Sequence, residues 1–164
     1  MSNKHIKQKL IDEIIAYLHT ELLLAMEAAN NAHSAAVDDQ SVAETQYDTL
    51  AIEASYLAEG QSKRVLEYQQ ALNAYQVLAL PTLNQNSVIT LGTLIQLAKD
   101  SACQHWFFIG PYAGGFRSTI TNQQITVITP QSPMAKALLG KQQGDDIEII
   151  LGDEKLTDEI VLVQ

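Results

Sequence analysis

Apolar residues in the first eighty positions recur at steps of three and four residues. This spacing is typical of amphipathic helices, and neither stripe can be buried without a partner. We therefore expect two long helices that pair as an antiparallel coiled-coil hairpin, with the connection near Ala35–Ser41, where the first stripe fades. The first stripe is Ile6, Leu10, Ile14, Leu18, Leu22, Ala25, Ala29 and Ala32, and the second is Leu50, Ala54, Leu57, Gln61, Val65, Tyr68, Leu72, Tyr75 and Ala79.

The pattern changes after Leu80. All four prolines and seven of the eight glycines follow that residue, and short runs rich in Val, Ile and Thr predict strands. Ser132-Pro133 opens a short helix, with serine as the N-cap, and Gly140 ends it. Trp106, Phe107 and Phe108 are expected to fill the core of the sheet. The predicted strands are 88–97, 106–109, 124–128, 146–151 and 159–163.

These patterns predict an α+β protein with an N-terminal antiparallel helical hairpin and a C-terminal antiparallel β domain that carries one short helix. The expected boundaries are 1–80 for the hairpin, 81–86 for a linker that begins at Pro81, and 87–164 for the β domain. The second helix is expected to reach Leu80. We also expect the β domain to fold on its own.

Charge and composition exclude several classes of protein. The 164 residues carry a net charge of −9, and neither half has a basic face, so autonomous binding of nucleic acid is not expected. The single cysteine, Cys103, cannot form an internal disulfide, and the four histidines lack ligand spacing. No apolar run suits a membrane span or a signal peptide. We expect a cytoplasmic monomer without a cofactor of its own, and a partner that is a basic protein surface or a metal ion.

The most specific string in the chain is residues 128–149, ITPQSPMAKALLGKQQGDDIEI. It resembles the C-terminal signature of the Gre family of bacterial transcription elongation factors, and the resemblance extends upstream through residues 88–93 (VITLGT) and the turn at 110–115 (GPYAGG). The helical hairpin before it agrees in architecture and chain order. The resemblance implies an FKBP-like domain that docks on the outside of RNA polymerase, while the coiled coil enters the secondary channel. It also implies that the docking loop is formed by Gln131, Ser132, Pro133, Met134 and Lys136, although Ser132 and Pro133 are equally explained as a helix cap.

Asp38, Asp39 and Glu44 form an acidic cluster at the predicted tip of the hairpin. Carboxylate oxygens suit Mg²⁺, and a second Mg²⁺ in a two-metal centre can activate water. The resemblance implies that these acids reach the polymerase active site, where Asp38 and Asp39 would touch only a magnesium ion that the polymerase holds. Another interpretation is structural: Ser41-Val42-Ala43-Glu44 fits a capping box, and the two aspartates would favour the positive end of the second helix.

The tip departs from the family pattern. Cleavage-stimulating members carry a tip resembling Asp-Leu-Ser-Glu-Asn-Ala-Glu-Tyr, whereas residues 38–47 here read DDQSVAETQY. If Glu59-Gly60 is aligned with the family, Glu44 matches its glutamate but Ser41 stands in place of its aspartate. If Tyr47 is aligned instead, neither acid matches. No Lys or Arg lies between Lys9 and Lys63. Two versions of the function stay open, stimulation of transcript cleavage or regulation that blocks or remodels the active site, and the second is favoured.

The leading prediction is therefore an accessory factor acting on RNA polymerase, not an enzyme and not a sequence-specific DNA-binding protein. The alternative is an FKBP-type peptidyl-prolyl isomerase with a helical arm, because Leu-Leu-Gly-Lys followed by Gly-Asp and a strand also occurs there. Such an enzyme needs an apolar pocket with an aromatic floor. A third possibility is a helical adaptor that uses its hairpin only to dimerise.

Overall fold

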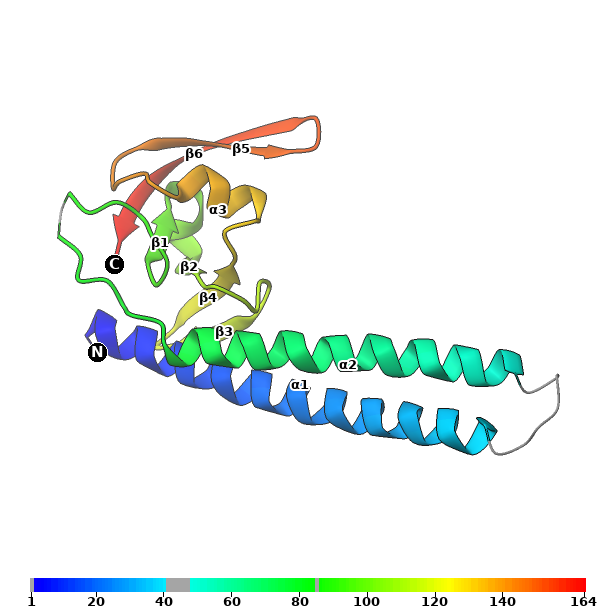
Figure 1. Ribbon diagram of the computed structural model, residues 1–164. Helices are drawn as coiled ribbons and strands as arrows, with labels where there is room; N and C mark the ends of the chain where they lie inside the picture. The colour runs from blue at the N-terminus through cyan, green and yellow to red at the C-terminus, as the bar shows by residue number, and fades with distance from the viewer. Residues whose placement is uncertain (1, 41–47, 85) are drawn as a thin grey trace. The chain divides into compact units, whose positions relative to one another are not determined.

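The computed structural model describes residues 2–40, 48–84 and 86–164, except for the side chains of residues 37–40 and 48–51. Two long helices precede six strands, one 3₁₀ helix and one short helix (Figure 1). The chain divides into two compact units. One unit is Ala16–Asn73, and the other joins Met1–Ile15 to Ala74–Gln164. The first four turns of the N-terminal helix therefore group with the β domain, whose ability to fold alone stays a prediction.

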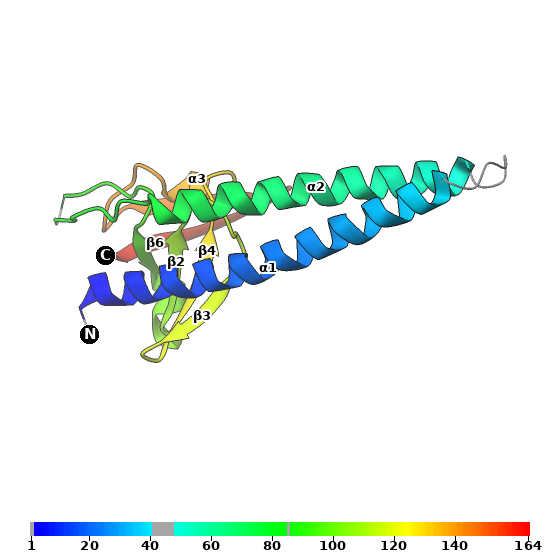
Figure 2. The same cartoon turned by 60° about the horizontal axis from the view of Figure 1, so that its bottom comes forward.

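The predicted hairpin is present. Helix α1 runs over Asn3–Gln40 and helix α2 over Asp48–Gln76, and within the unit Ala16–Asn73 the two lie side by side and antiparallel in both views (Figures 1 and 2). The predicted connection is wrong over residues 35–40, because α1 continues through Gln40, and Ser41 lies outside the described residues. The stripe does not fade where expected: Ala36 is buried one turn after Ala32, and alanine is the best helix former.

The second stripe is confirmed over most of its length, with two corrections. Leu57 is exposed, and Ala58 takes the half-buried position instead, because the step after Ala54 is four residues and not three. Helix α2 also ends at Gln76, before the predicted Leu80. Pro81 explains the earlier end, since its ring would clash with the carbonyl of Val77 and it disfavours helical geometry at the preceding residue.

The β domain contains one six-stranded sheet in the order β3-β4-β2-β1-β6-β5. Four neighbouring pairs are antiparallel, but β2 and β4 are parallel, so the predicted antiparallel domain is a mixed one. The chain crosses from β2 to the sheet edge through residues 110–116 before β3 and β4 form a hairpin. The bounds are β1 Leu94–Leu97, η1 Ala98–Cys103, β2 His105–Ile109, β3 Arg117–Ile120, β4 Gln123–Ile128, α3 Pro133–Leu138, β5 Asp146–Leu151 and β6 Glu154–Val163.

Three strand predictions differ from the structure. The last strand, predicted as 159–163, is longer, because β6 begins at Glu154. Residues 88–93 form a loop ahead of β1, where Gly92 adopts a φ of +80°. Its Cβ, if present, would lie 2.9 Å from the ring of Pro81, so both the backbone angle and the space require glycine. Strand β3 was not predicted, because Arg-Ser-Thr-Ile places a single fully buried residue, Ile120, on an edge strand.

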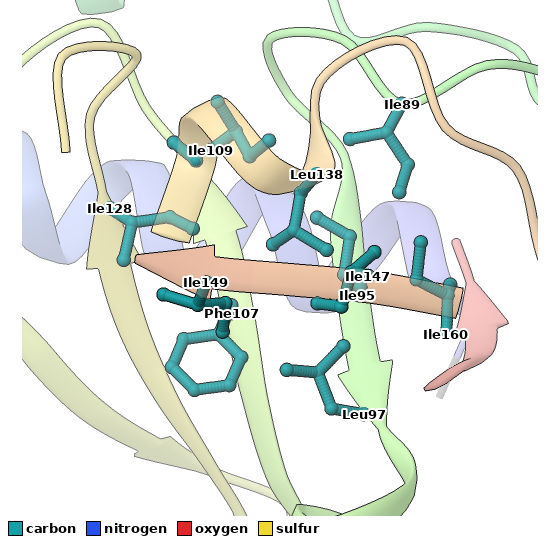
Figure 3. Packing of buried hydrophobic residues seen from close by; sticks show 11 residues of the cluster. Ile89, Ile95, Leu97, Phe107, Ile109, Ile128, Leu138, Ile147, Ile149 and Ile160 are labelled. Carbon is teal, nitrogen blue, oxygen red and sulfur yellow. The ribbon is translucent and has the colours of Figure 1, made fainter. Parts of the chain in front are cut away.

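One face of the sheet packs against α3 and the β5–β6 ribbon (Figure 3). Phe107 and Ile109 of β2 point to this face. Burying a side chain of this size contributes about 1.5–3 kcal/mol. The cluster is Ile89, Ile95, Leu97, Phe107, Ile109, Ile128, Ala135, Leu138, Ile147, Ile149 and Ile160.

The opposite face carries Trp106 and Phe108, which alternate with the residues of the first cluster along β2. It is covered by the start of α1, where Leu10 and Ile14 have no exposed surface. Ser118, in register with Ile125 on this face, hydrogen-bonds to Glu13 of α1. Because both faces of β2 are covered, the strand reads Trp-Phe-Phe-Ile without alternation. The prediction that Trp106–Phe108 belong to the core is confirmed.

Candidate functional site

The hairpin arm, defined here as residues 16–73, is held together by small side chains. Ala25, Ala32 and Ala36 of α1 are buried, which allows the two helix backbones to approach closely. The Tyr68 hydroxyl of α2 donates a hydrogen bond of 3.2 Å to Glu21 Oε2 of α1. From Ala16 to Gln40, α1 alone extends for about 37 Å at 1.5 Å per residue. The arm is therefore slender and long.

The arm is strongly acidic. Residues 16–73 contain nine acidic and two basic side chains, a net charge of −7. Glu27, Glu53 and Glu59 are exposed, and no acid–base ion pair forms among the arm residues that the structure describes. Burial, and then the charge of Glu21, raise the pKa of Tyr17 above its usual value. The negative charge is thus left largely uncompensated along the arm.

Asp38 and Asp39 lie in the last turn of α1, as the backbone of this helix runs through Gln40. The interpretation that they favour the positive end of the second helix is not tested, because residues 41–47 lie outside the described residues. In the last turn of a helix, a carboxylate is unfavourable for that helix by about 0.3–1 kcal/mol. Ser41 and Glu44 lie outside the described residues, so the capping box is not tested. Among the residues that are described, no three His, Cys, Asp or Glu side chains gather as metal ligands.

The predicted docking loop forms the start of α3. Ser132 is its N-cap: the side-chain oxygen accepts a hydrogen bond of 3.2 Å from the Ala135 backbone N–H, and Pro133 follows in the first turn. The capping prediction is confirmed. Gly140, with a φ of +79°, follows the helix, and its N–H donates to the Ile89 carbonyl at 3.0 Å. The helix is therefore fixed at both ends.

The five predicted docking residues are not equally available. Gln131, Pro133 and Lys136 are exposed, whereas Ser132 is half-buried. Met134 packs against the core cluster. Only the exposed three, together with the edge of Met134, can meet a partner without the helix moving.

Residues of β5 extend this surface in a way that the sequence motif did not indicate. A shallow groove of about 340 Å³ is lined by Pro133, Lys136 and Ala137 of α3 and by Glu148 and Ile150 of β5. Ile150 is 57% exposed although it is aliphatic, and Glu148 pairs with Lys155 at 2.9 Å. An exposed β-branched residue two positions after Glu148, at the end of an alternating edge strand, could have marked this surface in the sequence.

The polar pocket beside β2, β3 and β4 is a structural feature. Its histidine, His105, is engaged at both ring nitrogens: Nδ1 lies 3.4 Å from Asp100 Oδ1, and Nε2 lies 2.9 Å from Thr126 Oγ1. The ring also stacks against Phe107. His105 is therefore a positioned half-buried residue and not a free acid–base group.

The isomerase alternative is not favoured. The three aromatic side chains of β2 are buried in the core: Trp106, Phe107 and Phe108. Four cavities in the described part of the chain are lined by no Trp, Tyr or Phe ring. In the described part of the chain, no helix is long and apolar enough to cross a membrane.

Residues 84–164 match the family model described as "Transcription elongation factor, GreA/GreB, C-term". This segment holds the loop before β1, the whole sheet and the capped α3. Its class is therefore that of the GreA/GreB C-terminal domains, and the chain is similar to transcription elongation factors of the Gre family.

Among curated relatives, the chain is similar to transcription elongation factor GreA of Sulfurovum sp. (strain NBC37-1), with 31% identity over 97 residues, or 59% of this chain and 56% of the relative. It is also similar to GreA of Francisella tularensis subsp. novicida (strain U112), with 26% identity over 101 residues, or 62% and 60% of the two chains. The matched part thus spans less than two thirds of these relatives.

Solved structures that resemble the chain include the transcription factor Gfh1, with 19% identity, a TM-score of 0.36, and coverage of 91% of this chain and 92% of the other. Another is GreA factor homolog 1 (Gfh1) of Thermus thermophilus, with 15% identity, a TM-score of 0.35, and coverage of 92% and 94%.

Proposed function

We propose that this chain binds RNA polymerase and regulates transcription elongation, with the hairpin arm entering the secondary channel and Asp38 and Asp39 reaching the active centre. The observation that carries the proposal is the placement of these two aspartates. They lie at the end of a slender arm, at the helix terminus where carboxylates are unfavourable. A carboxylate does not favour this end of the helix, which supports a role for the two aspartates in an interaction outside the hairpin.

The acidic arm suits a site that holds a divalent cation. Carboxylate oxygens are preferred ligands of Mg²⁺, but one or two of them alone hold it weakly, because this cation gives up its waters reluctantly. We therefore expect no magnesium of the protein's own. Beside a metal held by the polymerase, the same carboxylates share the ion or displace it. The chain then acts as an accessory factor, and the polymerase performs the chemistry.

The arm lacks basic residues where a cleavage factor would be expected to contact RNA. At 1.5 Å per residue, Lys63 lies about 22 Å and Arg64 about 24 Å along α2 from Asp48, its first residue. An arm without positive charge near its end holds the RNA 3′ end poorly, since phosphate contacts need Lys or Arg. This favours regulation of the active site over stimulation of transcript cleavage.

Docking is assigned to the surface formed by Pro133, Lys136, Ala137, Glu148 and Ile150. It combines a rigid capped helix with an exposed aliphatic residue and a charge of each sign, as interface surfaces commonly do. The partner face on the polymerase is expected to be apolar at its centre, opposite Ile150.

The test measures binding to purified core RNA polymerase by the wild type and by Pro133→Glu and Ile150→Glu. Each change places a charge in the groove, so affinity should fall at least about tenfold. Val88→Glu is the matched control, because Val88 is a similarly exposed aliphatic residue of the same domain outside the groove. Unchanged affinity of both groove variants would remove this surface from the interface, and no binding by the wild type would overturn the proposed function.

A further inference from the structure

A pocket of about 330 Å³ lies in the β-domain unit, away from the docking surface. Asn3, Lys4 and Lys7 of α1 line one side of it, and the segment Leu80–Leu83 together with Val163 and Gln164 lines the other. Its walls are largely aliphatic: Leu80, Pro81, Leu83 and Val163. The positive end of a 38-residue helix meets this pocket at Asn3 and Lys4.

Lys7 is the unusual residue of this pocket. Only 4% of its surface is exposed, and no hydrogen bond or ion pair involves its side chain in the described part of the chain. Lysine is almost never buried without a partner. Burial lowers the pKa of Lys7 to about 8, so the amine is still mostly protonated at neutral pH.

A lysine with so little exposed surface and no counter-ion is costly, and an anion that enters the pocket beside Lys7 would relieve this cost. The charged groups around Lys7 are few. Lys4 is a second cation on the same helix. The segment Leu80–Leu83 and the end of β6 contribute no ionisable side chain to the pocket. Lys4 and Lys7 thus place two cationic side chains at this pocket, in a protein whose net charge is −9.

We propose that this pocket binds a small aliphatic carboxylate, with the carboxylate on Lys7 and the hydrocarbon against Leu80, Pro81, Leu83 and Val163. The aliphatic walls and the single buried ammonium favour a monoanion with an apolar body. A phosphate carries more charge to desolvate and is held best by arginine forks, and no arginine lines this pocket. The volume is that of about eleven water molecules in the liquid, which suits a short-chain acid.

The experiment titrates the full-length protein with hexanoate, with hexanamide as its neutral counterpart and with inorganic phosphate, and follows backbone amide resonances by NMR. Hexanoate should shift resonances around Lys7 and Leu83, and hexanamide should bind at least about tenfold more weakly. This comparison uses the wild type alone and does not depend on how a variant folds. Equal binding of hexanamide, or no binding of hexanoate at millimolar concentration, would overturn the proposal, and so would phosphate binding as tightly as hexanoate.

Variants locate the site. Lys7→Met removes the charge and keeps an unbranched apolar side chain of similar length, so hexanoate affinity should fall about tenfold or more while the thermal melt stays cooperative. Lys9→Met is the matched control, because Lys9 is exposed two residues further along α1, and its affinity should match the wild type. Equal affinity of Lys7→Met and Lys9→Met would place the bound acid elsewhere and contradict the proposal.

Discussion

The hydroxyl of Tyr75 donates a hydrogen bond of 2.6 Å to the backbone carbonyl of Tyr112. Tyr75 lies in the last turn of α2 and is almost fully buried, and Tyr112 lies in the loop that carries the chain from β2 to β3. Burial raises the pKa of the Tyr75 hydroxyl well above its usual value, although the hydrogen bond acts in the opposite direction. The contact fixes the end of α2 to this loop.

Gly110 makes this arrangement possible. A Cβ at this position would collide with the Tyr75 hydroxyl oxygen and would also lie 3.0 Å from Val127 Cγ1. We expect Tyr75→Phe to lower the free energy of unfolding by about 1 kcal/mol, the value of one hydrogen bond. Gly110→Ala should cost about 1–3 kcal/mol through overpacking.

The two changes should not be additive, since Tyr75→Phe removes the atom with which the new Cβ collides. In urea unfolding, the double variant should lose about 1 kcal/mol less than the two single losses together. Additive losses would mean that the clash at Gly110 does not involve Tyr75.

The cap of α3 gives a second prediction. Ser132→Ala removes the acceptor for the Ala135 N–H and should lower stability by about 1 kcal/mol, whereas Ser132→Asp should retain it. Urea unfolding of the full chain measures both. An Asp variant as unstable as the Ala variant would show that the hydroxyl does more than cap the helix.

Stability should rise between pH 8 and pH 10 because of Lys7. Burial lowers its pKa from the ordinary 10.5 to about 8 in the folded chain, so over this range the unfolded chain binds more protons than the folded one, and the free energy of unfolding increases with pH. The gain is on the order of 2 kcal/mol. Above pH 10 the raised pKa of Tyr75 and Tyr17 acts in the opposite direction, because the unfolded tyrosines lose their protons first.

Urea unfolding at intervals from pH 7 to pH 10 measures this effect. Lys7→Met should be more stable than the wild type at pH 7 and should lack the rise, whereas Lys9→Met should keep it. A rise of the same size in Lys7→Met would assign it to another group.

The hairpin could be predicted from the sequence because helix periodicity is local: stripes of three- and four-residue steps need only the chain itself. The ends of the helices were harder. Alanine is only weakly apolar, so the pattern at Ala35 and Ala36 did not indicate that α1 continues through Gln40. The ring of Pro81 would clash with the carbonyl of Val77, four residues earlier in the chain. Helix α2 therefore ends before Leu80, the residue that directly precedes the proline.

The motif around Ser132-Pro133 placed α3 and its cap correctly, because capping depends on adjacent residues. The neighbours of α3 could not be predicted in the same way. Glu148 and Ile150 reach its surface only through the pairing of β5 with β6, and Lys7 enters an aliphatic pocket only because Leu80–Leu83 and Val163 fold against α1. These contacts join segments far apart in the chain, and no local pattern specifies them.

The central claim is that Asp38 and Asp39 act at the active centre of RNA polymerase. The most direct measurement incubates backtracked elongation complexes with the protein and reads RNA cleavage and extension on a gel. It compares the wild type with the double variant Asp38→Asn/Asp39→Asn. The control is Glu27→Gln/Glu53→Gln, which removes two charges elsewhere on the arm. The account predicts that the Asn pair abolishes the effect of the protein while polymerase affinity stays within about threefold, and that the Gln pair keeps the effect. Full activity of the Asn pair would contradict the account and would leave the arm as a steric plug.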